Sequence, residues 1–102
     1  MIIKLFCSAG MSTSLLVTKM QEAAKSRGLD AQIDAFPEAT LDQETNDCTV
    51  ALLGPQVRFM LKSAKEICTP KGIPVDVIPM QHYGMMNGEA VLDLALKMIE
   101  EK

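Results

Sequence analysis

Residues 2–14 read IIKLFCSAGMSTS, and this stretch decides the fold. Its start, residues 2–6, is a short apolar run with β-branched and aromatic side chains, which predicts a strand. Residues 7–14 are mostly small or carry hydroxyl groups, which is typical of a loop. Apolar residues then recur at helical spacing over residues 14–27, and a glycine follows as a stop signal. The sequence therefore predicts a strand, a loop and a helix in succession, with Cys7 directly after the strand.

Three further strands and two further helices are predicted along the chain. The strands are expected at residues 31–36, 49–53 and 74–79, and the helices begin at Gly54-Pro55 and at Gly88. Alternating strands and helices favour an α/β fold, in which a mostly parallel sheet has helices on both faces. The second strand alternates like a half-exposed edge strand, whereas the continuous apolar run of the third predicts burial on both faces.

The sequence pattern does not determine whether the second and third strands run parallel. The connection between them is polar and expected to be irregular, with one helical turn near residues 38–41. Because it is short for a parallel crossover, the pattern favours a parallel connection without fixing it.

Length and composition favour one compact domain over residues 1–102, located in the cytoplasm. Hydrophobic residues make up 48% of the chain, enough to form a core without disulfide or metal support. The net charge is −3, Trp is absent and no basic stripe carries interleaved aromatic residues, which argues against a nucleic-acid partner. The apolar runs are too short for membrane insertion, and the N-terminus lacks the pattern of a signal peptide. Three cysteines, an odd number, suit a reducing compartment.

Cys7 is the candidate reactive residue, because open α/β sheets bind ligands at the carboxyl ends of their strands. Unpaired amides and the positive dipole at the start of the following helix attract a phosphate group. The predicted phosphate-binding residues are Ser8, Ala9, Gly10, Met11, Ser12, Thr13 and Ser14. Gly10 permits a positive φ, and the hydroxyl groups of residues 12–14 can donate hydrogen bonds or cap the helix. The same field favours the thiolate form of Cys7, which is a good nucleophile toward phosphorus.

A purely structural interpretation of Cys7 is the alternative, with the thiol as a small buried hydrophobe beside an ordinary helix cap. The combination of a cysteine and seven mostly small residues, between a strand and a helix, favours the functional interpretation. Cys48 abuts a strand and Cys68 lies on an apolar helix face, so both are expected to be structural.

Several motifs along the chain resemble one known family. They are LFCSAGMSTSLLV at residues 5–17, AFPE at 35–38, LLGPQV at 52–57, Tyr83-Gly84 and Asn87-Gly88. Together they resemble the enzyme IIB component of the lactose/cellobiose family of sugar phosphotransferase systems. The loop is more similar to the cellobiose and chitobiose branch than to the lactose branch, whose loop is richer in glycine.

The resemblance implies a phosphocarrier, that is, a protein-phosphocysteine–sugar phosphotransferase. Members of the family accept a phosphoryl group from a histidine of their IIA partner and pass it to a sugar imported by the membrane-embedded IIC partner. The acceptor cysteine falls on Cys7 and the phosphate loop on residues 8–14. The family fold is a four-stranded parallel sheet of order 2-1-3-4 flanked by helices, and neither a metal nor an organic cofactor is expected. The resemblance implies a β-linked disaccharide of the cellobiose or chitobiose kind, while the IIC partner selects the individual sugar.

Two other functions are alternatives to a phosphocarrier. A low-molecular-weight cysteine phosphatase has a similar loop, but an arginine at the sixth position after its cysteine binds the phosphate through paired hydrogen bonds. Thr13 occupies that position here, and the chain contains no Asp-Pro pair that could supply the general acid. The other alternative is a binding domain that senses phosphorylation and passes nothing on. A redox function lacks support, because the sequence has no Cys-x-x-Cys motif.

Gln56 and Tyr83 are candidate contacts at the rim around Cys7, since each follows a predicted strand of the sheet. His82 lies beside Tyr83, but a solvent-exposed loop histidine is favoured over a proton donor or phosphate relay. Met85 and Met86 fit an adaptable contact surface and simple loop filling equally well.

Overall fold

The computed structural model describes residues 1–8 and 11–101 of the chain. Its strands and helices are β1 (Ile2–Cys7), α1 (Met11–Ser26), β2 (Gln32–Pro37), α2 (Leu41–Glu44), β3 (Val50–Leu53), α3 (Leu61–Cys68), β4 (Val75–Val77), α4 (Met80–Gly84) and α5 (Gly88–Glu100). Short 3-10 segments lie at Glu38–Thr40, Thr45–Asp47, Pro55–Met60 and Thr69–Lys71.

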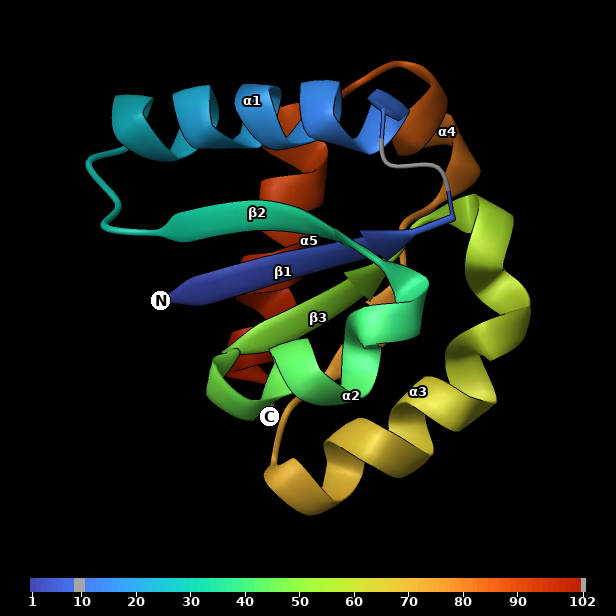
Figure 1. The fold of residues 1–102 in the computed structure, drawn as a ribbon. Coiled ribbons are helices and arrows are strands. Elements are labelled where there is room, and N and C mark those ends of the chain that lie inside the picture. The colour runs from blue at the N-terminus through green and yellow to red at the C-terminus, as the bar shows by residue number, and fades with distance from the viewer. Residues whose placement is uncertain (9–10, 102) are drawn as a thin grey trace.

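The four strands form one parallel sheet in the order β2-β1-β3-β4, as predicted. Figure 1 shows β2, β1 and β3 side by side. The chain crosses from β2 to β3 through α2 and its flanking 3-10 turns, which confirms the parallel connection that the pattern favoured. Side chains of α1 and α5 pack on one face of the sheet, and those of α2 and α3 pack on the other. Because all strands are parallel, their carboxyl ends lie at one edge, where β1 leads toward α1.

Alternation along the strands builds two apolar cores. In β1, Ile3 and Leu5 face the α1 and α5 side, whereas Phe6 belongs to the core on the α2 and α3 side. The edge strand β2 is half-exposed and β3 is fully buried, as the two sequence patterns predicted. The sheet is therefore covered on both faces, as its apolar runs require.

Several boundaries differ from the sequence prediction. Helix α1 begins at Met11, three residues earlier than predicted, because residues that suggest a loop also fit the first turn of a helix. Pro55–Met60 forms a 3-10 segment, and the α-helix starts only at Leu61. Strand β4 covers Val75–Val77 alone. The prediction missed α4, Met80–Gly84, since five residues are too few for helical periodicity to show.

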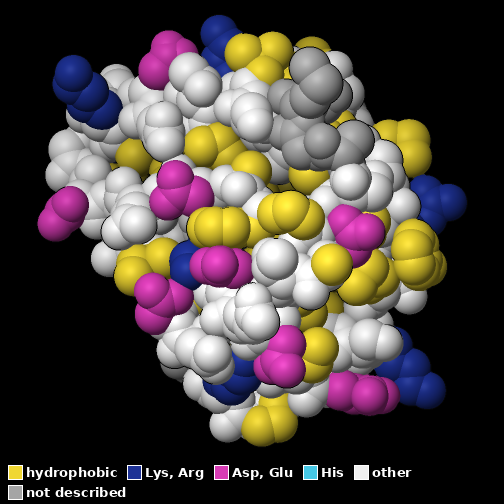
Figure 2. Space-filling view, viewed as in Figure 1, with side chains coloured by type: hydrophobic (Ala, Val, Ile, Leu, Met, Phe, Trp, Pro, Cys, Tyr) yellow, Lys and Arg dark blue, Asp and Glu magenta, His cyan; other side chains and the backbone are white. Residues whose placement is uncertain are grey.

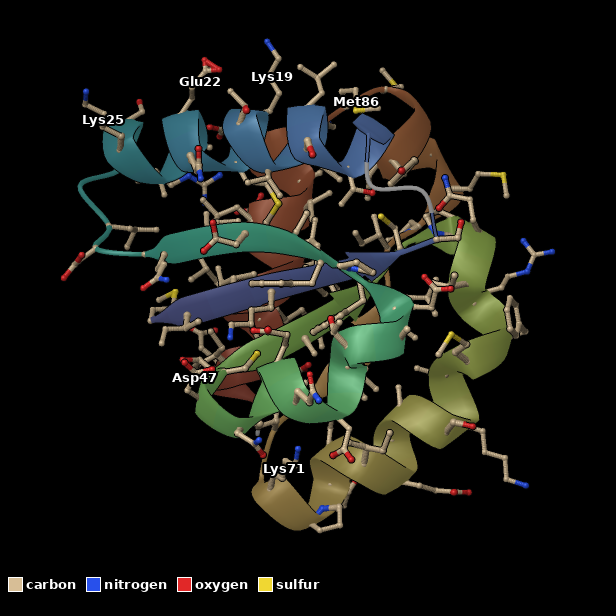
Figure 3. All side chains as sticks on the ribbon, viewed as in Figure 1. Lys19, Glu22, Lys25, Asp47, Lys71 and Met86 are labelled. Carbon is tan, nitrogen blue, oxygen red and sulfur yellow. The ribbon has the colours of Figure 1, made fainter. Side chains whose placement is uncertain are left out.

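Helices α1 and α5 approach closely at Gly88, the first residue of α5. A Cβ atom on Gly88 would lie 2.5 Å from the backbone carbonyl carbon of Lys19 and 2.6 Å from the backbone nitrogen of Met20. The Lys19 side chain itself points outward from α1 (Figure 3). The side chain of Asn87 caps α5, where its Oδ1 accepts a hydrogen bond from the backbone nitrogen of Ala90 at 3.0 Å. The absence of a side chain at residue 88 thus sets how deeply α5 packs against α1.

Lys4 places a buried charge between β1 and the crossover that contains α2. Its Nζ lies 2.6 Å from a carboxylate oxygen of Asp47 and 3.2 Å from one of Glu44, and it donates to the Glu44 backbone oxygen at 2.8 Å. Burial lowers the pKa of Lys4, but the hydrogen bonds to Asp47 and Glu44 outweigh burial, so the pKa is raised. The hydrogen bond from Lys4 in turn lowers the pKa of Asp47, which follows α2 (Figure 3). This network ties the crossover to the central strand.

Candidate functional site

The candidate site lies at the carboxyl end of β1. Cys7 is the last residue of that strand and is buried, with 2% of its surface exposed. Helix α1 starts at Met11, and its first turn contains no acidic residue. The positive end of the helix dipole is therefore not offset by a carboxylate of that turn, which favours an anion there. Ala9 and Gly10, two of the predicted phosphate-binding residues, lie outside the described residues.

Other predicted loop residues differ in exposure. Ser8, which follows Cys7, and Ser14, in the first turns of α1, are exposed, whereas Thr13 is fully buried. Met11 and Ser12 are placed in the first turn of α1 by their backbone. Part of the stretch predicted as a phosphate loop is thus the start of a helix.

Thr13 and Tyr83 meet inside the protein at this end of the sheet. The Oγ1 of Thr13 lies 3.0 Å from the phenolic oxygen of Tyr83, at hydrogen-bond distance. Tyr83 belongs to α4, which lies beside the start of α1 in Figure 1. The two residues are 70 positions apart in the sequence, so no local pattern could have revealed this pair.

Gln56 is the second predicted rim residue, and the structure brings it near Cys7. The chain leaves β3 at Gly54, whose backbone nitrogen donates to the backbone oxygen of Phe6 at 2.8 Å. A Cβ atom on Gly54 would lie 2.8 Å from Oε1 of Gln56 and 3.4 Å from Cβ of Cys7. The amide of Gln56 and the Cβ of Cys7 therefore flank the same glycine.

A hollow of about 550 Å³ opens beside these residues. It is lined by Pro55, Gln56, Arg58, Phe59, Met80, Tyr83 and Gly84. Phe59 and Met80 are strongly exposed for apolar side chains, with 78% and 62% of their surface accessible. Neither residue was predicted, because Phe59 lies in a 3-10 segment where an α-helix was expected and Met80 begins α4, which was not predicted.

The residues that flank Tyr83 take three different positions. His82 lies in α4 and is half-buried, and does not lie in an exposed loop. Its backbone oxygen accepts a hydrogen bond from the backbone nitrogen of Asn87 at 2.9 Å. Met85 is exposed, whereas Met86 packs against the core beside α1 (Figure 3).

Cys48 and Cys68 lie away from this edge of the sheet. Cys48 precedes β3, its thiol donates to the backbone oxygen of Val50 at 2.8 Å, and burial raises its pKa to about 11. Cys68 ends α3, and burial raises its pKa as well. The three cysteines form no disulfide. A high pKa suppresses the reactive thiolate, so these two positions suit packing better than chemistry.

Three further features of the described residues bear on the binding of nucleic acid, metal ions and membranes. Side chains of both signs are scattered over the described part of the face shown in Figure 2, without a broad basic patch. Within residues 1–8 and 11–101, no cluster of His, Cys, Asp or Glu side chains could hold a metal ion. In the same described part of the chain, no helix has the length and apolar character needed to cross a bilayer.

Cys7 therefore ends the first strand of a parallel α/β sheet, and a helix begins four residues later at Met11. The family model described as "PTS system, Lactose/Cellobiose specific IIB subunit" matches residues 2–94 of the chain. The chain therefore belongs to the lactose/cellobiose-specific IIB family of the phosphotransferase system.

Similar proteins carry related names. A galactose-specific EIIB component from Lactococcus lactis subsp. cremoris and a cellobiose-specific EIIB component from Lactococcus lactis subsp. lactis are each 48% identical over 99 residues, with 92% of both chains covered. An oligo-beta-mannoside-specific EIIB component from Bacillus subtilis is 39% identical over 97 residues, covering 95% of this chain and 94% of the relative.

Solved structures agree with the fold. The cellobiose-specific IIB component from Borrelia burgdorferi is 46% identical and superposes with a TM-score of 0.83, covering all of this chain and 94% of that one. The lactose-specific IIB domain from Streptococcus pneumoniae has a TM-score of 0.82 at 15% identity, with 96% of both chains covered, and so supports the fold alone.

Proposed function

We propose that Cys7 accepts a phosphoryl group from a phosphohistidine of a IIA partner and passes it to a sugar imported by a membrane-embedded IIC partner. The observation that carries this proposal is the position of Cys7 at the end of β1, before the start of α1, in a member of the IIB family. The chain would then be a single phosphocarrier domain over residues 1–102 that works in the cytoplasm. A β-linked disaccharide of the cellobiose or chitobiose kind is the proposed sugar.

The proposed reaction has two steps. In the first, the Cys7 thiolate attacks phosphorus, an S–P bond forms, the N–P bond of the donor breaks and its imidazole leaves. In the second, a sugar hydroxyl attacks phosphorus, the S–P bond breaks, the hydroxyl proton goes to a base or water, and the thiolate returns. Neither step needs an oxidant, a metal or an organic cofactor.

The residues proposed to hold the phosphoryl group are those of the predicted loop, Ser8 to Ser14. Backbone amides at the start of a helix are suited to phosphoryl oxygens, because they have no partner within the helix. They also stabilise charge that develops in transfer. Gln56, which flanks Gly54 together with Cys7, is proposed to border the bound group from β3's side.

A cysteine phosphatase is less well supported by the same contacts. Phosphatase chemistry uses an arginine at the position of Thr13, and Thr13 is buried against Tyr83. Without a guanidinium group and a general acid, hydrolysis of phosphocysteine would be slow, which suits a carrier. A domain that only senses phosphorylation would hold the group as a carrier does, and onward transfer distinguishes the two.

The test is incubation with a phosphorylated IIA protein, followed by mass spectrometry of the intact chain. We expect one phosphoryl group on the wild type and on Cys48→Ala, a matched control that removes a thiol far from the site, and none on Cys7→Ser. An unlabelled wild type, or labelling that survives in Cys7→Ser, would contradict the proposal.

The labelled chain is then mixed with membranes that contain a IIC protein and with cellobiose or chitobiose. Transfer of the group to the sugar supports the carrier, and a label that stays on Cys7 favours the sensing domain. Rapid release of inorganic phosphate from an aryl phosphate would instead favour the phosphatase.

A further inference from the structure

We propose that Tyr83 is a positioning residue for phosphoryl transfer, and that it acts through the hydroxyl group of Thr13. This inference rests on the proposed function, because it assigns a role within the site around Cys7. The observation behind it is the contact of 3.0 Å between the two side-chain oxygens, which joins α4 to the first turn of α1.

Both hydroxyl groups are withdrawn from solvent. Thr13 has none of its surface exposed, and Tyr83 has 8% exposed. Within the described residues, every buried side-chain nitrogen or oxygen has a hydrogen-bond partner. A buried hydroxyl that loses a hydrogen-bond partner is destabilising, so removal of either group also removes a partner of the other.

The backbone around Tyr83 holds the ring in place. Its nitrogen donates to the oxygen of Pro79 at 3.1 Å, and its oxygen accepts from the nitrogen of Met86 at 3.1 Å. Met86 has a φ of 51°, the left-handed conformation that glycine usually occupies after a helix. This conformation is retained where surrounding contacts determine it, and here Met86 packs against the core. Tyr83 is thus a fixed anchor.

The chemical role of Tyr83 depends on which of the two hydroxyl groups donates the proton. A hydroxyl group has one proton to donate and two lone pairs to accept with. Either oxygen could be the donor across this contact. Because a phenol is a stronger acid than an aliphatic alcohol, the proposal assigns the donated proton to Tyr83, which leaves the Thr13 proton for another acceptor. Thr13 is the third residue of α1, at the position where a phosphatase loop carries arginine. Tyr83 therefore orients the Thr13 hydroxyl toward the phosphoryl site. It also fixes the position of the start of α1 relative to Cys7.

The experiment compares phosphorylation of Cys7 in wild type, Tyr83→Phe, Thr13→Val and the double variant. Tyr83→Phe removes one oxygen and keeps the buried ring, and Thr13→Val keeps the shape of the side chain. We expect each single variant to accept the phosphoryl group about tenfold more slowly, and the double variant to be no slower than either. Thr13→Ser, which retains the hydroxyl, should restore most of the rate.

A second readout separates positioning from stability. The ³¹P chemical shift of the phosphocysteine should move in Tyr83→Phe and in Thr13→Val. Thr45→Val is the matched control, because Thr45 is also fully buried and donates to the oxygen of Leu41 at 2.7 Å, on the α2 side of the sheet. It should lower stability and leave both the ³¹P shift and the transfer rate unchanged.

The outcomes distinguish this inference from the proposed function. A wild type that takes no phosphoryl group overturns both. A labelled wild type with an unchanged rate and ³¹P shift in Tyr83→Phe overturns the positioning role alone, as do additive losses in the double variant. If Tyr83→Phe fails to fold, the transfer rate and ³¹P shift of Thr13→Val and Thr13→Ser test the positioning role. Values equal to those of the wild type in Thr13→Val would overturn it.

Discussion

Replacement of Gly88 by alanine tests how the packing of α5 sets the position of α1. The added Cβ would lie 2.5 Å from the Lys19 carbonyl carbon, 2.6 Å from the Met20 nitrogen and 2.7 Å from the Lys19 Cβ. All three atoms belong to or adjoin the backbone of a helix, so no rotation of a flexible side chain can relieve the contact. The two helices would have to separate by about 1 Å to restore ordinary van der Waals distances near 3.5 Å.

The expected cost follows from this geometry. Overpacking of a close contact typically costs about 1–3 kcal/mol, and a rigid backbone neighbour places Gly88→Ala toward the upper end of that range. Alanine gains up to about 1 kcal/mol of helix propensity over glycine, but less at the first residue of a helix than in its interior. We therefore expect a net loss of about 2 kcal/mol, which for a chain of this size lowers the melting temperature by roughly 8–16 °C.

Urea unfolding followed by circular dichroism measures this loss directly. With a slope of about 1–3 kcal/mol per molar urea, the midpoint should fall by roughly 1 M. Gly84→Ala is the matched control, because Gly84 lies within helix α4 and an added Cβ would meet nothing within 4 Å. It should leave the midpoint unchanged or raise it. A Gly88→Ala midpoint equal to that of the wild type would refute the packing argument.

Two further predictions concern caps and charges. Asn87→Ala should destabilise the protein by about 1 kcal/mol in urea unfolding, because it removes the cap that accepts from Ala90, and Asn87→Ser should recover most of the loss. Lys4 lowers the pKa of Asp47 below its ordinary 3.8, so the stability from their pair is complete above pH 3.8 and is lost as the pH falls through the lowered pKa. Urea midpoints between pH 2 and 6 should show this loss in the wild type, and Asp47→Asn should lack it.

Much of the fold was predictable from local patterns, because the order of apolar and polar residues within a strand indicates which of its faces are buried. The continuous apolar run of β3 predicted a strand buried on both faces, and the alternation of β2 predicted an edge. The order of the strands came from the family resemblance, since periodicity cannot tell which strands are neighbours. Helix α4 was missed because it is a single turn that rests on tertiary contacts, among them the burial of Tyr83.

Some features of the candidate site could likewise be predicted from local sequence, and others could not. The position of Cys7 between a strand and a helix start is a local property, so the sequence indicated it. The hydrogen-bond partner of Thr13 is not a local property, because Tyr83 lies 70 residues later and contacts Thr13 only in the folded chain. The exposure of Phe59 beside Gln56 likewise depends on where the 3-10 segment after β3 turns.

Under the proposed function, the presence of Thr13 where a phosphatase loop carries arginine has two consequences. It removes the group that would clamp a phosphate and assist hydrolysis, which lengthens the life of a phosphocysteine. It also leaves the start of α1 without the rigidity that a paired guanidinium group provides. In our proposal the contact between Thr13 and Tyr83 restores rigidity, and the neutral hydroxyl group of Thr13 binds a phosphoryl oxygen less tightly than a guanidinium would. A carrier needs that balance, because it must hold its phosphoryl group against water and still release it to a sugar hydroxyl.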